Sequence, residues 1–109
     1  MTNLPMNNFT FHDRTSTIST GKELSVVSGY QTINIDFETT GTFTAQFESK
    51  DLFGDWSPIM AVNLTTMTLI TSTSDVNSTY QVDLTGLVGF RVNITSITGT
   101  ISAMGKVVG

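Results

Sequence analysis

Hydrophobic and polar residues alternate with a period of two along most of the chain, and helical periodicity is almost absent. The run TINIDFETT, residues 32–40, places Ile33, Ile35 and Phe37 on one side of an extended chain and polar residues on the other. After Gly41, the run FTAQFES repeats the pattern over residues 43–49. Two such runs joined by a short turn containing glycine predict an antiparallel hairpin with one face in a core.

The same alternation recurs in short runs that are separated by polar or glycine-containing turns. These runs are NFTFHD (8–13), KELSVVS (22–28), MAVNL (60–64), MTLIT (67–71), YQVDL (80–84), FRVNIT (90–95) and TISAMGKVV (100–108). In the third of them the pattern directs Met60, Val62 and Leu64 inward, and the polar stretch 71–78 reads as a loop.

Short strands in this number predict an all-β fold, a single antiparallel β-sandwich of about eight strands, although alternation alone does not separate a sandwich from a small barrel. We expect one domain over residues 1–109, with residues 1–6 as a loose N-terminal arm. A chain of 109 residues is long enough for one core.

Composition excludes several classes of protein. Net charge is −4 with five scattered basic residues, which argues against a nucleic-acid groove. The chain has no cysteine, so disulfides and thiolate metal sites are excluded. We recognise no signal peptide and no transmembrane segment, and we expect no cofactor.

We recognise no catalytic motif in the sequence, and we expect that the protein is not an enzyme. The single histidine, His12, stands beside Asp13 and Arg14 in a predicted surface cluster at a strand end. The strand carboxylates point outward, as solvated side chains do: Asp36, Glu38, Glu48 and Asp83. Calcium binding would require the loop aspartates Asp51, Asp55 and Asp75 to meet at one end of the sandwich.

The segment FESKDLFGDWSPIM, residues 47–60, contains the only tryptophan, Trp56. Gly54 and Asp55 are turn formers, and Gly54 can take a positive φ. We therefore expect a hairpin whose tryptophan covers the edge of the core and closes the turn. The alternative is a stacking platform for a cell-wall glycan, which Tyr30 and Tyr80 would complete.

This segment and the C-terminal part of the chain resemble a family of small phage and prophage proteins. A strand ending in FES is followed by a Gly-Asp turn and Trp56, and YQVDLTGL (80–87), FRV (90–92), ITS (94–96) and TGTI (98–101) match the family's C-terminal pattern. The match covers residues 30–108 and includes Gly86 and Arg91. The family includes the Bacillus prophage lytic-cassette protein YomS and the C-terminal half of XepA.

The resemblance implies a C2-like antiparallel sandwich, subunits that assemble as pentameric discs, and no catalytic residues. It favours a phage structural protein of a tail, baseplate or capsid decoration, found in the virion or, before assembly, in the host cytoplasm. Its partners would be further copies of itself and other phage structural proteins. The alternatives are an accessory lysis or membrane-associated ring protein and a carbohydrate-binding module.

Two features refine these expectations. Leu52 and Phe53 depart from the more polar family pattern, so they are either a subunit contact, a membrane-facing tip, or side chains that fold back onto the core. Arg91 is expected to pair with an outward acid on a neighbouring strand, such as Asp83.

Overall fold

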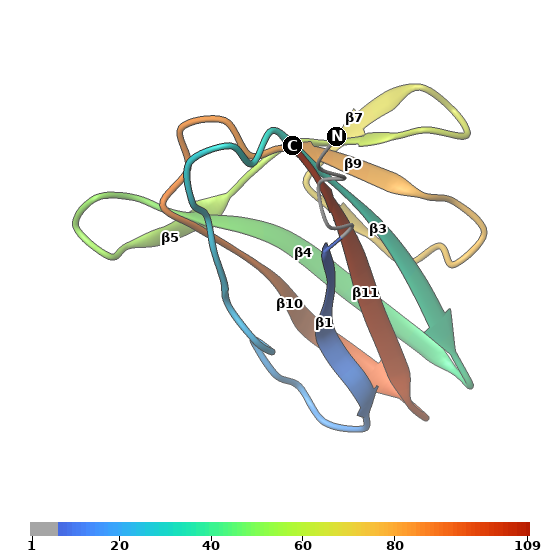
Figure 1. The fold of residues 1–109 in the computed structure, drawn as a ribbon. Coiled ribbons are helices and arrows are strands. Elements are labelled where there is room, and N and C mark those ends of the chain that lie inside the picture. Colours follow the sequence, from blue (N-terminus) through green and yellow to red (C-terminus); the bar gives the residue numbers. More distant parts are fainter. Residues whose placement is uncertain (1–6) are drawn as a thin grey trace.

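The computed structural model describes residues 7–109 and contains eleven β-strands. The predicted arm, residues 1–6, lies outside the described residues. Figure 1 shows the strands in two layers that cross over each other. The strands are β1 (Asn7–Thr15), β2 (Leu24–Ser25), β3 (Thr32–Thr39), β4 (Thr42–Lys50), β5 (Trp56–Pro58), β6 (Ala61–Asn63), β7 (Thr68–Ile70), β8 (Ser72–Thr73), β9 (Tyr80–Asp83), β10 (Gly89–Thr98) and β11 (Ile101–Val108).

The strands form two antiparallel sheets, which confirms the predicted all-β sandwich. The six-stranded sheet has the order β1-β11-β3-β9-β6-β7, and the five-stranded sheet runs β2-β10-β4-β5 with β8 paired to β4. The predicted hairpin between β3 and β4 connects one sheet to the other, so its two strands do not pair with each other. This is a correction: the short turn at Gly41 makes a corner of the sandwich instead of a β-hairpin.

The core lies between the sheets and is rich in aromatic rings. Phe37 and Tyr80 come from the six-stranded sheet, whereas Phe47 and Phe90 come from the five-stranded sheet. The Phe47 ring lies 5.6 Å from Tyr80, 6.2 Å from Phe37 and 6.4 Å from Phe90, measured between centroids. These contacts hold the two layers together, because such rings bury a large apolar area and prefer offset or edge-to-face packing.

The alternation predicts the buried face correctly in β3, β4, β9, β10 and β11 but wrongly in β6. There Ala61 and Asn63 are buried, whereas Met60 and Leu64 are 56% and 37% exposed. The reason is a turn: the side-chain oxygen of Asn63 accepts hydrogen bonds from the backbone N–H groups of Thr65 and Thr66. Asn63 faces inward to cap that turn, and because side chains alternate along a strand, Ala61 then faces inward as well.

Two other predicted boundaries differ. The run 22–28 forms only the short strand β2, and the predicted loop 71–78 contains β8, which pairs with β4 at Ala45 and Gln46.

Two turns that connect the sheets meet at one end of the sandwich, the corner between β3 and β4 and the corner between β10 and β11. The N–H of Thr100 donates to the hydroxyl of Thr40, and the N–H of Thr40 donates to the carbonyl of Thr100. A Cβ on Gly41 would lie 2.0 Å from the carbonyl oxygen of Thr98. Only glycine lets these two turns approach so closely.

We therefore expect Gly41→Ala to reduce the free energy of unfolding by about 3 kcal/mol, the upper end of ordinary single substitutions. Gly54→Ala is the matched control, because Gly54 has a φ of 86° but open space around its Cβ position. It should cost only the left-handed strain, about 1–2 kcal/mol. Urea unfolding of both variants measures the difference, and equal losses would contradict the close contact.

Candidate functional site

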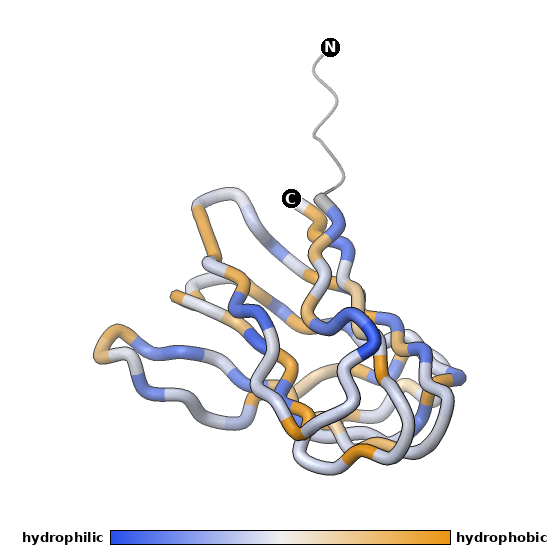
Figure 2. Tube along the Cα trace, turned by 90° about the horizontal axis from the view of Figure 1, so that it is seen from below, coloured by the Kyte–Doolittle hydropathy of each residue, from blue (hydrophilic) through white to orange (hydrophobic). Residues whose placement is uncertain are grey.

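The hairpin between β4 and β5 projects from the body of the sandwich (Figure 1). Leu52 and Phe53 lie in its turn and are 88% and 92% exposed. Figure 2 shows this hydrophobic tip flanked by hydrophilic residues at the far end of the hairpin. The two side chains therefore do not fold back onto the core. They are the most exposed large hydrophobic side chains among residues 7–109.

The turn that presents them is fixed by hydrogen bonds. One carboxylate oxygen of Asp51 accepts from the N–H groups of Phe53 and Asp55, at 2.8 and 2.9 Å. The N–H of Asp51 donates to the carbonyl of Asp55, and the N–H of Gly54 donates to the carbonyl of Asp51. Gly54 has the positive φ that the sequence predicts. The exposure of the tip is thus imposed by an ordered turn.

Trp56 begins β5 and lies opposite Lys50 of β4. Its ring is half-buried on the outer face of the five-stranded sheet, with the Arg91 guanidinium carbon 4.1 Å and the Lys50 ammonium 5.7 Å from the ring centroid. The expectation that it covers the edge of the core is wrong, because it packs on cations outside the sheet. This cation–π stack closes the base of the hairpin.

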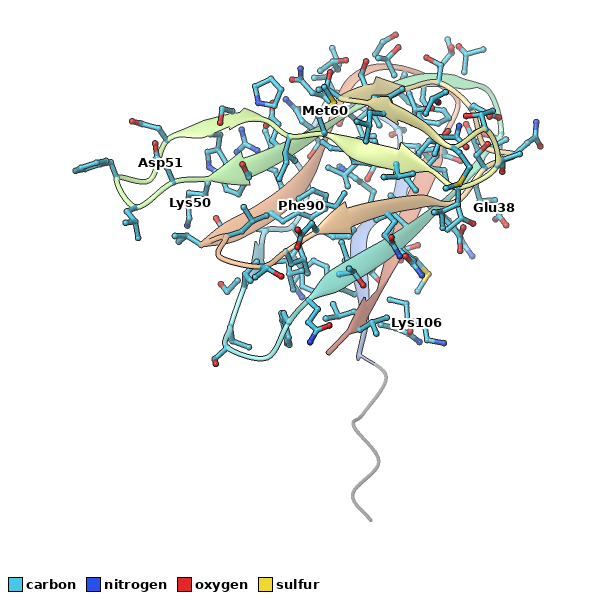
Figure 3. The ribbon with its side chains drawn as sticks, turned by 90° about the horizontal axis from the view of Figure 1, so that it is seen from above. Glu38, Lys50, Asp51, Met60, Phe90 and Lys106 are labelled. Atoms are coloured by element: carbon cyan, nitrogen blue, oxygen red, sulfur yellow. The ribbon has the colours of Figure 1, made fainter. Side chains whose placement is uncertain are left out.

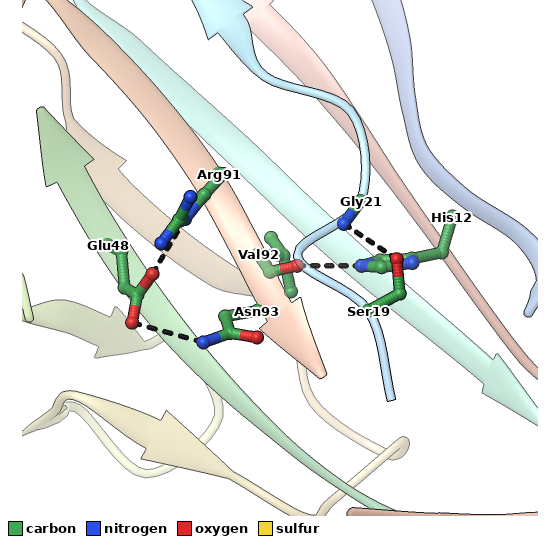
Figure 4. A network of polar contacts seen from close by, with 7 residues as sticks. All are labelled: His12, Ser19, Gly21, Glu48, Arg91, Val92 and Asn93. Atoms are coloured by element: carbon green, nitrogen blue, oxygen red, sulfur yellow. Dashed lines mark hydrogen bonds and ion pairs between the residues drawn. The ribbon is translucent and has the colours of Figure 1, made fainter. Parts of the chain in front are cut away.

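Arg91 connects the stack to a buried acid (Figure 4). Its Nε donates to Glu48 at 2.7 Å, and Asn93 donates to the other oxygen of the same carboxylate at 3.2 Å. The side chain of Glu48 is only 9% exposed. The predicted partner, Asp83, is wrong because β9 belongs to the other sheet; Asp83 instead accepts from the N–H of Thr85.

A groove of about 420 Å³ lies beside the tip, between the β4–β5 hairpin and the loop after β9. Figure 3 places Lys50 and Asp51 near the end of this hairpin, away from Phe90 in the sandwich. The groove lining is mainly apolar. It consists of residues 49–53 on one side and Gly86, Leu87 and Val88 on the other.

His12 is buried, contrary to the predicted surface cluster, and only Asp13 and Arg14 beside it are exposed. Its Nε2 lies 2.6 Å from the carbonyl oxygen of Val92, so this nitrogen carries the proton and donates. Its Nδ1 lies 3.1 Å from the hydroxyl of Thr15.

The bond from His12 completes one edge of β10. Along that edge, Phe90 pairs with Leu24 and Ile94 bridges to Ser19. Between them, the imidazole donates a hydrogen bond to the carbonyl of Val92. Two irregularities in the pairing of β1 with β11, on either side of His12, accompany this inward position. The imidazole thus ties one sheet to the other (Figure 4).

The structure does not assemble the other hypothetical sites. Among residues 7–109, no three carboxylate or imidazole groups come together as metal ligands. Asp75 accepts from the N–H of Asn77 and the hydroxyl of Ser78 within its own loop. Tyr80 belongs to the core, where burial raises the pKa of its hydroxyl, and Tyr30 packs against the core. A platform of three aromatic rings for a glycan is therefore absent from this part of the chain.

Lys50 and Glu48 are site residues that the sequence analysis missed. Lys50 binds Glu23 at 2.6 Å and stacks on Trp56. The sequence could have predicted that Lys50 lies beside Trp56, because a turn over residues 51–55 places residue 50 opposite residue 56. The burial of Glu48 could not be predicted from the sequence, since it depends on the pairing of β4 with β10.

We expect Arg91→Ala to reduce the free energy of unfolding by about 2 kcal/mol, because Glu48 loses its charged partner. It should also shift the fluorescence emission of Trp56, the only tryptophan. Lys106→Ala removes an exposed charge and is the control. Unchanged emission in Arg91→Ala would contradict the stacked arrangement.

The buried histidine predicts a pH dependence of stability. Burial lowers the pKa of His12 below its ordinary value of 6.5, and the bond to Val92 offsets only part of this. Below about pH 6.5 the unfolded chain binds a proton that the folded chain resists, so this contribution to stability is present above that pH and is lost as the pH falls. Urea unfolding between pH 8 and 5 should show a smaller loss in His12→Gln than in the wild type. Parallel pH profiles would overturn this role.

Comparison with known proteins supports the family expected from the sequence. The sequence model of the family described as XepA matches residues 5–107. The SPβ prophage-derived protein YomS of Bacillus subtilis strain 168 is 28% identical over 101 residues, which cover 92% of this chain and 85% of YomS.

Two solved structures have the same fold. The crystal structure of the SPBc2 prophage-derived protein YomS superimposes with a TM-score of 0.91 and 24% identity, covering 100% of this chain and 97% of that one. The crystal structure of the PBSX exported protein XepA gives a TM-score of 0.90 at 27% identity, covering 95% of this chain but only 38% of XepA. No helix in residues 7–109 is long and apolar enough to cross a membrane. With a family match over nearly its whole length, this prophage-related chain belongs to the XepA family.

Proposed function

We propose that this protein is a non-enzymatic phage or prophage structural subunit that assembles with copies of itself into a ring, with a pentamer favoured, as part of a virion. The observation that carries the proposal is the ordered hairpin that presents Leu52 and Phe53 to solvent. An exposed apolar pair of this kind is a liability in an isolated subunit and is typical of a contact surface.

The surface as a whole supports assembly. Only 13% of the residues are charged, so few charges must lose water when copies pack together. The six-stranded sheet ends in β1 on one side and β7 on the other, and a strand at a sheet edge offers backbone groups to a neighbour. The ring and its pentameric symmetry come from the family resemblance.

Neither His12 nor Trp56 supports a rival role in catalysis or sugar binding. Both ring nitrogens of His12 are engaged in bonds that hold the fold. One face of the Trp56 ring is occupied by Arg91, which removes a stacking surface for a glycan. Other phage structural proteins are the further partners that the proposal implies.

A second candidate is a membrane-associated accessory protein of a lysis cassette. The apolar tip also suits insertion into a lipid surface, and the related XepA is described as an exported protein. The aspartates Asp51 and Asp55 beside the tip weaken attraction to anionic lipid.

Native mass across a dilution series tests the proposal. We expect a discrete oligomer at micromolar concentration that dissociates on dilution, because burial of apolar surface drives association and mass action opposes it. A monomer at every concentration would contradict the structural role. Co-sedimentation with zwitterionic vesicles, with an anionic vesicle as control, separates the second candidate: a virion subunit stays in the supernatant.

A further inference from the structure

We propose that a polar hollow on the outer face of the six-stranded sheet binds a neutral saccharide. The hollow is lined by Asn8, Asn34, Asp36, Thr79 and residues 104–106. It lies on the opposite side of the molecule from the β4–β5 hairpin, as the positions of Lys106 and Asp51 show in Figure 3. The inference goes beyond the proposed function and does not depend on self-assembly.

The pairing of three inner strands brings the polar side chains of the hollow together. Asn34 and Asp36 of β3 alternate with buried residues and therefore face outward. On β11, Lys106 pairs with Asn34 and Met104 pairs with Asp36. On β9, Gln81 pairs with Asn34 from the other side. An acid, an amide and an ammonium group thus occupy adjacent positions on one face of the sheet.

Hydrogen bonds within this face orient the acid and the amide. The hydroxyl of Thr79 donates to one carboxylate oxygen of Asp36 at 2.5 Å, and the amide of Gln81 donates to the side-chain oxygen of Asn34 at 3.1 Å. These bonds leave the second oxygen of Asp36 as an acceptor and the NH₂ group of Asn34 as a donor for a ligand. Groups that are oriented before binding lose little conformational freedom when a ligand arrives.

The charges in the hollow select a neutral ligand. Lys106 and Asp36 both line it, yet neither belongs to an ion pair among residues 7–109. An anion near Lys106 would also meet the carboxylate of Asp36, so its net attraction is small. A metal ion would need several carboxylates, and no cluster of metal-ligating side chains occurs among residues 7–109.

A saccharide matches the groups that remain. Each sugar hydroxyl can donate and accept, so neighbouring hydroxyls can donate to Asp36 and accept from Asn34 and Lys106. Met104 is 47% exposed beside them and offers an apolar, adaptable surface to the C–H face of a sugar ring. The mixture of polar groups and one apolar side chain therefore suits a polyhydroxylated ring better than a purely apolar ligand.

The shape of the hollow fits a small ligand and disfavours a peptide. Its volume is about 320 Å³, at the lower end of the range for small-molecule sites. A Cβ on Gly105 would point toward Ile33 and Phe11 in the core, so only the main chain of Gly105 faces the hollow. An extended peptide binds by adding a strand at a sheet edge, whereas β11, β3 and β9 are inner strands.

A nuclear magnetic resonance titration of the isotope-labelled protein tests the site. The probes are the methyl glycosides of glucose, galactose, rhamnose and N-acetylglucosamine, added separately, with sodium phosphate and tetramethylammonium chloride as charged controls. We expect at least one glycoside to shift the backbone amide signals of residues 34, 36, 79 and 104–106 in a saturable way. The charged controls should leave these signals unchanged.

Two variants remove the contacts on which the inference depends. Asp36→Ala removes the acceptor, and Lys106→Met removes the ammonium group but keeps a long side chain. Each should raise the dissociation constant of the glycoside at least tenfold, because each loses hydrogen bonds to a charged group. Glu38→Ala is the matched control, since Glu38 is also exposed on β3 but does not line the hollow. It should leave the constant unchanged, and circular dichroism checks that all three variants are folded.

The outcomes separate this inference from the proposed function. Saturable shifts at the hollow that weaken in Asp36→Ala and Lys106→Met, but not in Glu38→Ala, support saccharide binding. The inference is overturned if no glycoside shifts these signals, if the charged controls shift them as strongly, or if Glu38→Ala weakens binding equally. A monomer that binds a glycoside would contradict only the proposed assembly, and an oligomer that binds none would contradict only the saccharide site.

Discussion

The pairing of β4 with β10 is the interaction on which the rest of this structure depends. On the inner side it places Phe47 beside Phe90. Phe47 contacts Phe37 and Tyr80 of the opposite sheet, and Phe90 contacts Phe11 of that sheet. On the outer side the same register sets Arg91 opposite Glu48. The ladder therefore fixes both the aromatic core and the ion pair that supports the hairpin, and a slip by one residue would exchange the two faces.

Both edges of β10 are satisfied, which explains why the lone histidine is buried. One edge carries β4, and the other carries Leu24, Ser19 and the imidazole of His12 in turn. In this position the histidine acts as a structural donor that joins the sheets and has no free nitrogen for catalysis. On the outer face, the carboxylate of Glu48 is likewise engaged, because it accepts hydrogen bonds from Arg91 and Asn93.

The most exposed large hydrophobic side chains among residues 7–109 lie at the end of an ordered hairpin. Asp51, Gly54 and Trp56 together direct two large hydrophobic side chains into solvent. These side chains gain almost nothing from burial in the isolated chain, and covering the tip would be favourable. This is the physical reason for the proposal that the protein is a component of an assembly.

Period-two alternation predicted the all-β fold, its single core and the inward residues of the long strands, but it did not separate a sandwich from a small barrel. The short strand β6 escaped the rule because one turn-capping residue, Asn63, reversed its faces. Sheet membership was also beyond local patterning: Arg91 found Glu48 instead of Asp83 because strand order is set by long-range packing. The exposed tip was among the predicted alternatives. The signal was the position of two apolar residues in a turn with Asp and Gly, where polar residues are usual.

The most direct measurement of the central claim is the environment of residue 53 as subunits come together. An environment-sensitive dye on a single cysteine in Phe53→Cys would be followed from nanomolar to high micromolar protein concentration. We expect a blue shift of the emission that coincides with association, because the tip would pass from water into an apolar contact. An emission that stays the same while the mass increases would contradict it.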